Sequence, residues 1–552
     1  MECPQSRTLP DLLDEITARY PQREAVVWQD DRLTYAEYRS RVRQLAKGLY
    51  RLGVRAGDTV ALLMGNRPEW LLTDFAVALL GATLVPVSTW SRARELAYVL
   101  QHCHATTLIT VDRFRNQDFL AMLAEIGALH RQLPLLRRIV GVGPERYPGI
   151  TRFEELWDLG APVSDAEIEI LQRAVAPTDI PYLLYTSGTT STPKGVPLQH
   201  VGLIENMFHI GERQHLSEAD RLWMGLSLFW GFGCENALFA VMTHGGTVVL
   251  QEHFDAGAAL RLIEREQCTV YYGTPNVALA LWEHPDRTRV DLRALRTGAA
   301  IGPPHAMQMV MDLGAHAICN VYGLTECYGN CTVTEAGDPV EVRLHTVGHP
   351  LPGMQIKIAD PQTHRPLPPG AVGEIAIRGY LMPGYYQAPE QTAAAFDPDG
   401  YFLSGDFGFL DETGRLHFQG RLKDMVKTGG LNVAPLEVEE ILTTHPAVEQ
   451  AYVVGVPDLR KDEVVAAVVV CKPGSAVTED ELRAFCRRAL AGFKVPQRIW
   501  FVPRDALPLT ASGKVQKHLL RSMLVTEAAQ THDGGSALQE QESFPGPARS
   551  RA

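Results

Sequence analysis

The chain has 552 residues, of which 45% are hydrophobic and 21% are charged, and its formal net charge is -12. This composition is typical of a folded globular enzyme and excludes a disordered or fibrous chain, and the length predicts about two to four domains. The acidic balance argues against nonspecific binding to nucleic acid or to an anionic membrane, because both select basic surfaces. An anionic substrate therefore needs a local positive site.

The cysteines and the N-terminus indicate a cytoplasmic protein without a membrane span. The nine cysteines have no regular spacing, which favours free thiols in a reducing compartment. Cys327 and Cys331 form the closest pair, but no second pair flanks them at zinc-site spacing, so we expect ordinary core or pocket thiols. The N-terminus lacks a secretion signal. The apolar stretch 71–87 is interrupted by Asp74 and Gly81, which indicates a buried helix leading into a strand.

Helical and strand patterns alternate through the N-terminal part. Thr34 and Glu37 have capping-box spacing, apolar residues then recur at helical intervals, and Gly53 marks the end of a helix. We expect a strand at "DTVALLMGN", a helix from "PEWLLTDF", and further strands at "ATLVPVS", "GTVVL", "CTVYYG" and "AICNVYG". This alternation predicts a large layered α/β domain.

The C-terminal part has a different character. From about Gly348, short apolar runs separated by Pro and Gly predict a β-rich subdomain of the large domain. A helix at "PLEVEEILTTH" and strands at "QAYVVGV" and "VVAAVVVC" then predict a small α+β domain, and the last residues are polar enough to be disordered. The predicted boundaries are 1–420 for the large domain, 421–525 for the small domain and 526–552 for the tail.

The stretch "YTSGTTSTPKG" follows the apolar run "IPYLLY" and is expected to be a loop that leaves a buried strand. Its hydroxyls, the turn at Gly188 and the charge of Lys194 together form a clamp for phosphate oxygens. It is not a Walker A loop, because Lys194 is followed by Gly195. Taken alone, the stretch fits a solvated Ser/Thr turn equally well. Besides Gly188 and Lys194, the candidate phosphate-binding residues of this stretch are Thr186, Ser187, Thr189 and Thr190.

Four further motifs follow in order: "YGLTE", "YFLSGDFG", "GRLKDMVKTGGLNVAPLEVE" and "LPLTASGKVQK". With the first loop, they make the chain resemble the acyl-adenylate-forming superfamily, which comprises acyl- and aryl-CoA synthetases, peptide-synthetase adenylation domains and beetle luciferases. The resemblance extends from about residue 10 to residue 522. One departure is Ser191, where the family more often has glycine.

The resemblance is greatest to the fatty-acyl and aryl-CoA ligases, and it implies a two-step reaction. ATP and a carboxylic acid give an acyl-AMP and pyrophosphate, and the acyl group then passes to the thiol of coenzyme A. The implied cofactors are ATP, Mg²⁺ and coenzyme A. Three alternatives remain open: transfer to a separate acyl carrier protein, transfer to an amine, oxygen or another small nucleophile, and a noncatalytic nucleotide-binding protein. The oligomeric state is not predicted.

The resemblance also implies roles for nucleotide-binding residues. The loop from Thr186 to Thr190 would hold the β- and γ-phosphates, and Thr325 would contact the α-phosphate. Glu326 would be the Mg²⁺ ligand, since a hard cation needs oxygen donors; its alternative is a surface carboxylate. Asp406 would accept the ribose hydroxyls, with Arg421 beside it; a structural salt bridge between these two is the alternative. Tyr322 would lie against the adenine, and Gly298 and Ala299 belong to the same cofactor site.

Lysines of the small domain receive the catalytic roles. Lys514 would bridge the carboxylate and the phosphate or ribose oxygens during adenylation. Lys423 matches the family's hinge position, so the small domain is expected to be mobile and to swing between the two half-reactions. That motion would bring Lys427, Gly429 and Gly430 close to the approaching thiol.

The acid pocket is expected from residues 227–236, residues 296–300 and the segment around "YGLTECYGN". Phe229 is followed by Trp230 and Gly231, so the aspartate that holds the ammonium of an α-amino acid in peptide-synthetase domains is missing. Trp230 is either a gate to the pantetheine tunnel or plain core. The other expected pocket residues are Phe232, Cys234, Cys327 and Tyr328, and they suit a medium acyl chain or an aromatic acid. Tyr328 and Asn330 could form hydrogen bonds with a polar substituent of the acid.

Overall fold

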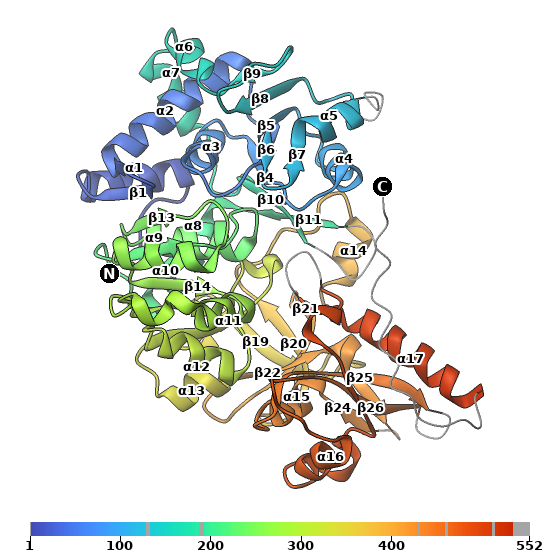
Figure 1. The fold of residues 1–552 in the computed structure, drawn as a ribbon. Coiled ribbons are helices and arrows are strands. Elements are labelled where there is room, and N and C mark those ends of the chain that lie inside the picture. The colour runs from blue at the N-terminus through green and yellow to red at the C-terminus, as the bar shows by residue number, and fades with distance from the viewer. Residues whose placement is uncertain are drawn as a thin grey trace. The chain divides into compact units, whose positions relative to one another are not determined.

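The computed structural model describes residues 2–127, 133–186, 193–428, 431–458, 462–509 and 514–533. The chain divides into two compact units (Figure 1). The first unit consists of Met1–Lys357, Ala376–Ser404 and Leu410–His417, and the second consists of Ile358–Ile375, Gly405–Phe409 and Phe418–Ala552. The sequence predicts a single boundary between the large and the small domain, at residue 420, whereas each of the two units is assembled from three separate segments of the chain. The predicted domain boundaries therefore stay a prediction.

The first sheet of unit 1 has seven strands in the order β11-β10-β4-β3-β5-β8-β9. All neighbours run parallel except the edge pair of β10 and β11. Its inner strands are almost entirely apolar, as expected for parallel strands that are covered on both faces. The strands are β3 (Thr59–Leu63), β4 (Thr83–Pro86), β5 (Thr107–Val111), β8 (Arg138–Val142), β9 (Thr151–Arg152), β10 (Tyr182–Thr186) and β11 (Lys194–Leu198).

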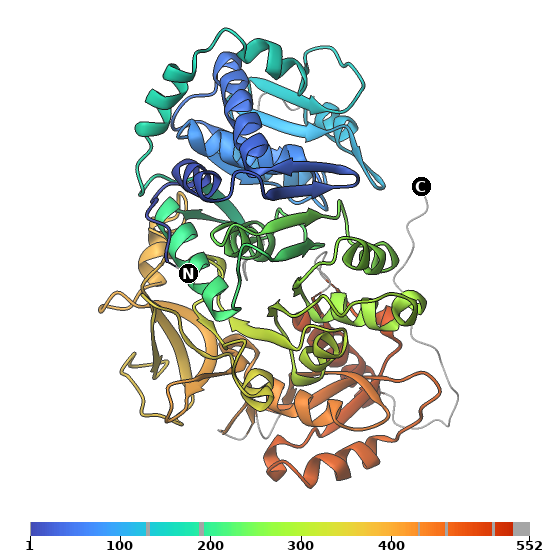
Figure 2. The ribbon, with the colours of Figure 1, turned by 90° about the vertical axis from the view of Figure 1, so that its left-hand side faces the viewer.

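The helices beside this sheet include the one whose two ends the sequence marks. Helix α2 spans Tyr35–Leu52, with the Thr34–Glu37 capping box at its start and Gly53 in the left-handed conformation at its end. In Figure 2, α2 and the other helices of residues 1–173 surround the blue strands. These helices are α1 (Leu9–Arg19), α3 (Pro68–Leu79), α4 (Ala93–His102), α5 (Phe119–Gly127), α6 (Glu155–Gly160) and α7 (Asp165–Arg173); a small hairpin joins β6 (Arg113–Phe114) and β7 (Gln117–Asp118).

The apolar stretch that contains Asp74 is confirmed as a buried helix, α3, that leads into β4. Within the part of the chain that the structure describes, no helix has both the length and the apolarity needed to cross a bilayer.

The second sheet of unit 1 has nine strands in the order β18-β17-β16-β15-β14-β12-β13-β1-β2. Its centre, from β16 to β1, is parallel. The predicted strands "GTVVL", "CTVYYG" and "AICNVYG" are confirmed as β13, β14 and β16. The strands are β1 (Glu24–Trp28), β2 (Asp31–Thr34), β12 (Arg221–Met224), β13 (Thr247–Leu250), β14 (Val270–Gly273), β15 (Thr297–Ala300), β16 (Ala317–Tyr322), β17 (Thr332–Val333) and β18 (His349–Pro350).

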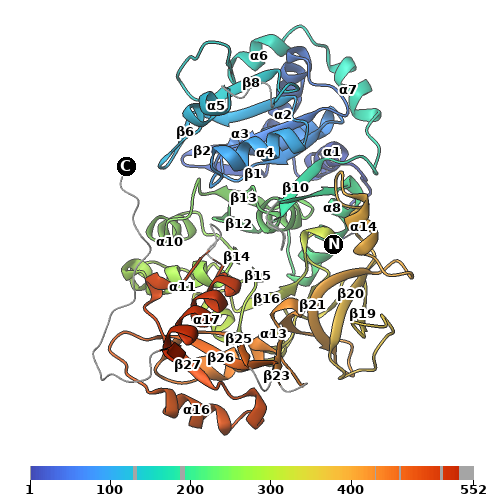
Figure 3. The ribbon, with the colours of Figure 1, turned by 90° about the vertical axis from the view of Figure 1, so that its right-hand side faces the viewer.

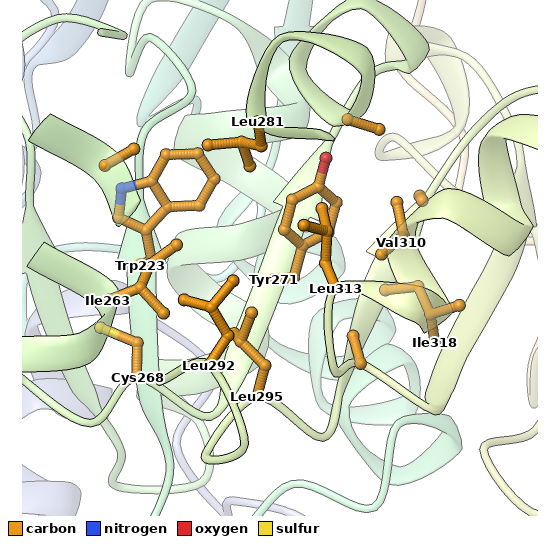
Figure 4. Close-up of a cluster of buried hydrophobic side chains, with 14 of the residues drawn as sticks. Trp223, Ile263, Cys268, Tyr271, Leu281, Leu292, Leu295, Val310, Leu313 and Ile318 are labelled. Carbon is orange, nitrogen blue, oxygen red and sulfur yellow. The ribbon is translucent and has the colours of Figure 1, made fainter. Parts of the chain in front are cut away.

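A dense apolar core forms between this sheet and the helices that follow its strands. Trp223 of β12 and Tyr271 of β14 are fully buried, and Leu281 and Val310 reach them from α11 and α12 (Figure 4). This core fixes the central parallel strands and hence the loops at their carboxyl ends. The helices and helical turns of this part are α8 (His200–Arg213), η2 (Phe232–Ala237), α9 (Leu238–Met242), α10 (Ala256–Arg265), α11 (Pro275–Glu283), η3 (Pro285–Arg289), α12 (Pro304–Asp312), η4 (Thr325–Cys327), α13 (Val340–His345) and α14 (Pro389–Ala394).

Short strands follow Gly348, as the sequence predicts. They form a four-stranded sheet in the order β19-β20-β21-β22, and the boundaries between the two units fall within these strands. The strands are β19 (Gln355–Ala359), β20 (Gly373–Arg378), β21 (Phe402–Leu410) and β22 (Leu416–Arg421).

The C-terminal part of unit 2 is a small α+β layer built on a five-stranded sheet. Strands follow the order β24-β23-β26-β25, and β27 pairs with β26. Helix α17 (Lys517–Asp533) lies along this sheet (Figure 3), with Leu520 and Leu524 buried against its valines. The other elements are η5 (Leu422–Asp424), β23 (Val426–Thr428), β24 (Leu431–Val433), α15 (Pro435–Thr443), β25 (Val448–Asp458), β26 (Asp462–Cys471), α16 (Glu479–Arg487), η6 (Gly492–Lys494), β27 (Arg498–Phe501) and η7 (Arg504–Ala506).

Helix α17 continues past residue 526, where the sequence places the start of a disordered tail. The helix runs to Asp533, and the predicted start of the tail stays a prediction. Residues 534–552 lie outside the described residues, and the disorder predicted for them stays a prediction.

The tight packing of β15 against β14 gives a stability test at Gly298. Its φ is +130°, and a Cβ would lie 1.8 Å from the Tyr271 carbonyl oxygen of the neighbouring strand. We expect Gly298→Ala to lower the stability by about 3 kcal/mol or more and the Tm correspondingly, because both strain and a backbone clash result. Gly127→Ala is the control, since no atom lies within 4 Å of its Cβ position. Equal melting temperatures of the two variants in thermal unfolding would contradict the packing described here.

Candidate active site

The predicted phosphate loop is closed by a hairpin of unit 1. Thr186 at the end of β10 and Lys194 at the start of β11 are register partners, so the two strands bring the loop's ends together. Both residues are half-buried. The loop residues between them lie outside the described residues, including the predicted ligands Ser187, Gly188, Thr189 and Thr190.

One tyrosine connects Lys194 with the predicted metal ligand Glu326. Tyr385 lies in the turn before α14, and its hydroxyl donates a hydrogen bond to Glu326 Oε1 at 2.8 Å. The Lys194 ammonium lies 4.5 Å from the centroid of the same ring, in cation–π contact. Burial, followed by the Glu326 carboxylate, raises the pKa of Tyr385, so its hydroxyl keeps the proton that it donates. The three residues come from segments far apart in the sequence.

Glu326 has the surroundings that an oxygen ligand for a hard cation needs. It lies in the helical turn η4 and is 8% exposed. In the described part of the chain, Tyr385 occupies Oε1, and no side chain donates a hydrogen bond to Oε2. No group of three or more His, Cys, Asp or Glu that could hold a metal is found among the described residues. A Mg²⁺ at Glu326 would therefore take its other ligands from phosphates and water, which is its usual preference.

The other predicted nucleotide contacts of unit 1 lie on, or directly after, two neighbouring parallel strands. Tyr322 ends β16 and is 7% exposed, and Thr325 begins the turn η4 that follows. Gly298 and Ala299 lie on β15, which pairs with β16 in register. In open α/β sheets, ligands bind beyond the carboxyl ends of such strands. The fold therefore brings Tyr322, Thr325 and Glu326 to an edge that is suited to binding.

The predicted acid segment contains an aromatic cluster that includes a residue missed from the sequence. Trp90 packs edge-on against Phe229 and Trp230, at centroid distances of 4.8 and 5.6 Å. Trp230 is half-buried rather than fully buried, which leaves part of its ring accessible. Trp90 lies in a loop without periodicity, about 140 residues before its partners in the chain. No local pattern could identify it, so only the fold reveals the contact.

The remaining predicted pocket residues are packed inside unit 1. Cys234 and Cys327 are 0% exposed, and burial raises the pKa of both thiols well above the usual range. The Tyr328 hydroxyl accepts a hydrogen bond from the Gln199 backbone N–H at 2.8 Å, and the side-chain amide of Asn330 donates to Asn236 Oδ1. Both polar groups thus have protein partners. The role predicted for them as contacts of a substrate substituent stays a prediction.

In unit 2, three predicted residues share one electrostatic environment. Arg421 Nε lies 3.5 Å from Oδ1 of the buried Asp406, so the salt bridge weighed as an alternative role is present. Lys514 is exposed as a whole residue. Nevertheless, protein packed around its ammonium lowers its pKa, the Arg421 guanidinium lowers it further, and the Asp406 carboxylate raises it.

The predicted hinge and thiol residues are only partly described. The backbone of Lys423 lies in the helical turn η5. Lys427 is exposed on β23, and its backbone N–H donates to Glu463 Oε2 at 2.9 Å. Gly429 and Gly430 lie outside the described residues.

Comparison with known proteins assigns the family. The model of the AMP-binding enzyme family matches residues 13–386, and that of the AMP-binding enzyme C-terminal domain matches residues 437–514. The chain belongs to the AMP-binding enzyme family. The "Putative acyl-CoA synthetase YngI" of Bacillus subtilis is 38% identical over 94% of this chain and 97% of its own length. The "Medium-chain acyl-CoA ligase ACSF2, mitochondrial" of Danio rerio is 34% identical over 94% of this chain and 88% of its own.

A solved structure of an aryl ligase is also similar. It is the anthranilate CoA ligase AuaEII in complex with anthranoyl-AMP, with a TM-score of 0.84 and 29% identity over 96% of this chain and 100% of its own. These findings confirm the predicted superfamily, the α/β fold class with a large and a small domain, and an AMP-forming acid–thiol ligase that uses ATP, Mg²⁺ and coenzyme A. The acyl-CoA ligases among the relatives favour coenzyme A over the alternative acceptors.

The charged neighbours of Lys514 can be tested with two variants that should shift its pKa in opposite directions. We expect Arg421→Gln to raise the pKa of Lys514, because the variant removes the guanidinium that lowers it. We expect Asp406→Asn to lower this pKa, because the variant removes the carboxylate that raises it. Competitive acetylation at a series of pH values, read by peptide mass spectrometry, measures both shifts, and the exposed Lys472 is the internal reference. Shifts of the same sign in both variants would contradict this arrangement.

Proposed function

We propose that this chain joins a medium-chain aliphatic or an aromatic carboxylic acid to coenzyme A, and that the residues described above carry out the two steps. The observation that supports the proposal best is the meeting of Lys194, Tyr385 and Glu326 beside the closed hairpin of the phosphate loop. A cation, a fixed carboxylate and a donor-rich loop are what a triphosphate with its metal requires.

The chemistry explains why these groups are needed together. A carboxylate is a poor electrophile, so one of its oxygens first attacks the α-phosphorus of ATP, and the bond to the β-phosphate oxygen breaks. Pyrophosphate leaves, and the acyl-AMP anhydride remains. The thiol of coenzyme A then loses its proton and attacks the acyl carbon, and AMP leaves. Several negative charges converge in the first step, and preorganised positive groups must stabilise them.

The residues of unit 1 serve the phosphates in this proposal. Thr186, Lys194 and the loop between them bind the β- and γ-phosphates that leave as pyrophosphate. Thr325 orients the α-phosphate, and Tyr322 lies against the adenine. Gly298 and Ala299 belong to β15, the strand that pairs with β16, which ends at Tyr322. Glu326 would hold Mg²⁺, which supplies charge neutralisation between the phosphates when it is bound.

The residues of unit 2 serve the ribose, the carboxylate and the thiol. Asp406 accepts the ribose hydroxyls, and Arg421 orients it through the ion pair. Lys514 contacts the reacting carboxylate, and its lowered pKa makes it a better proton donor than an ordinary lysine. Lys423 serves as the hinge, and Lys427, Gly429 and Gly430 line the approach of the thiol.

The apolar surroundings of the predicted pocket support this acid class. Phe229, Trp230 and Trp90 present aromatic surface, and Cys234 and Cys327 add apolar bulk. Such walls suit a medium acyl chain or an aromatic ring. The relatives named above cover both kinds, a medium-chain acyl-CoA ligase and an anthranilate CoA ligase. Trp230, only half-buried, is proposed as the gate between the acid and the pantetheine.

We further propose that the protein works in the cytoplasm. All nine cysteines are free, which fits a reducing compartment. Since one relative is named as mitochondrial, fractionation of the source cells is the test, and recovery of the protein in an organelle would contradict the proposal.

The proposed reaction is tested by its products. With MgATP and coenzyme A, we expect pyrophosphate release and a CoA thioester from medium-chain or aromatic acids, with products identified by mass. Lys514→Ala should lower the rate at least about 100-fold, because a preorganised charge is lost. Lys472→Ala, which removes an exposed lysine of the same unit, should retain full activity. Acyl-AMP that accumulates despite coenzyme A would contradict the acceptor, and full activity of Lys514→Ala would contradict the assigned role.

The hydroxyl of Tyr385 is tested through the metal. Tyr385→Phe keeps the ring beneath Lys194 but loses the hydrogen bond that orients Glu326. We expect the Mg²⁺ concentration for half-maximal pyrophosphate release to rise about 10–100-fold, the usual loss when a partner of a metal ligand is removed. The neighbouring Tyr386→Phe removes the same hydroxyl group from a ring that packs against His102, and it should leave this concentration unchanged. Equal Mg²⁺ dependence of the two variants would contradict the role of Tyr385.

A further inference from the structure

A buried carboxyl group without a hydrogen-bond partner lies in the predicted acid segment. Glu235 belongs to the π-helical turn η2 and is 1% exposed, and neither Oε1 nor Oε2 has a partner among the described residues. The side-chain amide nitrogen of the next residue, Asn236, is also buried without a partner. Buried polar groups in native proteins are nearly always hydrogen-bonded. Two adjacent side chains, Glu235 and Asn236, that both depart from this rule therefore indicate polar groups that bind a ligand.

The neighbouring polar side chains form hydrogen bonds with one another and with nearby backbone groups. Asn330 donates its amide to Asn236 Oδ1. Asn206 Nδ2 donates to the carbonyl oxygens of Tyr328 and Asn330, at 3.3 and 2.8 Å, and only its Oδ1 is without a partner. The Tyr328 hydroxyl accepts from the Gln199 backbone. The cluster is thus ordered by its own hydrogen bonds, and besides Asn206 Oδ1 it leaves the Glu235 carboxyl and the Asn236 N–H groups unused.

Two glycines show where the unused groups lie. A Cβ on Gly231 would come within 2.7 Å of Glu235 Oε1, and a Cβ on Gly329 would come within 2.8 Å of the same oxygen. The Gly329 Cβ would also lie 1.7 Å from Asn236 Nδ2. Gly231 belongs to one predicted pocket segment and Gly329 to another. The unused polar groups of Glu235 and Asn236 therefore lie where these two segments meet, in space that side chains at Gly231 and Gly329 would fill.

The chemistry of the two groups selects an oxygen atom. Burial raises the pKa of Glu235 well above its usual range, and the Glu326 carboxylate adds to this effect, which favours the protonated form of the carboxyl group. A neutral carboxyl donates one O–H and accepts at its other oxygen, and Asn236 Nδ2 donates. A hydroxyl or carbonyl oxygen matches this set. The methylene groups of a plain fatty acid offer no partner at all.

The π-helical turn offers the movement that such binding needs. Both carboxyl oxygens are covered by protein atoms, so a substrate oxygen reaches them only when the turn or the Gly329 loop adjusts. Single π-helical turns are rare and frequently lie at functional sites. Glycine at both contact points leaves the backbone free to adjust.

We infer that Glu235 and Asn236 form a specificity site for an oxygen atom of the acid substrate. The acid that the chain activates then carries a hydroxyl or carbonyl group in addition to its reacting carboxylate. This inference rests on the proposed function, because it takes the segments around Gly231 and Gly329 as walls of the acid pocket. It narrows the substrate class from medium-chain or aromatic acids to their oxygenated members.

The test compares pairs of acids that differ only in the polar group. The pairs are octanoic with terminally hydroxylated octanoic acid and with its keto counterpart, benzoic with para-hydroxybenzoic acid, cinnamic with para-hydroxycinnamic acid, and benzoic with para-aminobenzoic acid. For each pair, the ratio of kcat/KM for thioester formation and the ratio of ligand-induced Tm shifts are measured. We expect the wild type to favour the oxygenated member of at least one pair at least about tenfold, because a site built for a hydrogen bond rejects a partner without one.

The variants separate recognition from a structural role. Glu235→Leu should bring the ratio of that pair to about one. Glu235→Gln, which keeps a donor and an acceptor, should retain the preference. Asp74→Leu is the control for the loss of a buried carboxyl group, because Asp74 is equally buried but lies on α3, beside Tyr182; it should retain the wild-type ratio.

Each outcome decides a different claim. A wild type that treats both members of every pair alike, or a Glu235→Leu variant that keeps the preference, overturns the inference. If para-aminobenzoic acid is preferred over para-hydroxybenzoic acid, the inference that the site selects an oxygen atom is overturned. If no acid gives a thioester, the proposed function fails, and the Tm ratios still decide whether Glu235 selects an oxygenated acid.

Discussion

The hydrogen bond from Tyr385 to Glu326 is the interaction on which the site in unit 1 depends. It fixes the carboxylate after β16, and the same ring holds the ammonium of Lys194 at the start of β11. Three segments separated by many residues thus meet at one side chain. The tyrosine thus contacts both the carboxylate and the cation.

Much of this arrangement could be predicted from the sequence, because its signals are local. The capping box at Thr34 and the glycine at residue 53 mark the ends of α2. Apolar runs with β-branched residues identify parallel strands such as β16, which ends at Tyr322. The phosphate loop, "YGLTE" and the motif around Lys514 each occupy a few consecutive residues, so the family resemblance and the class of reaction followed from them.

The features that the sequence could not predict depend on contacts between distant residues. Tyr385 and Trp90 lie in loops without periodicity, and their partners are Glu326 and Trp230. Whether the Glu235 carboxyl has a hydrogen-bond partner depends on all the side chains that pack around it in the fold, so no pattern along the chain reveals that it has none among the described residues. Leu520 and Leu524 of α17 are buried against valines of unit 2 that lie far away in the chain, and no short motif of the helix predicts this contact.

The central claim is that the acid is activated by attack on the α-phosphorus of ATP. An acid whose two carboxylate oxygens carry a heavy oxygen isotope tests this most directly, with MgATP, coenzyme A and the wild-type chain. The account predicts that one heavy oxygen appears in AMP and the other in the carbonyl group of the thioester. AMP without the heavy isotope, or the label in inorganic phosphate together with ADP, would contradict it.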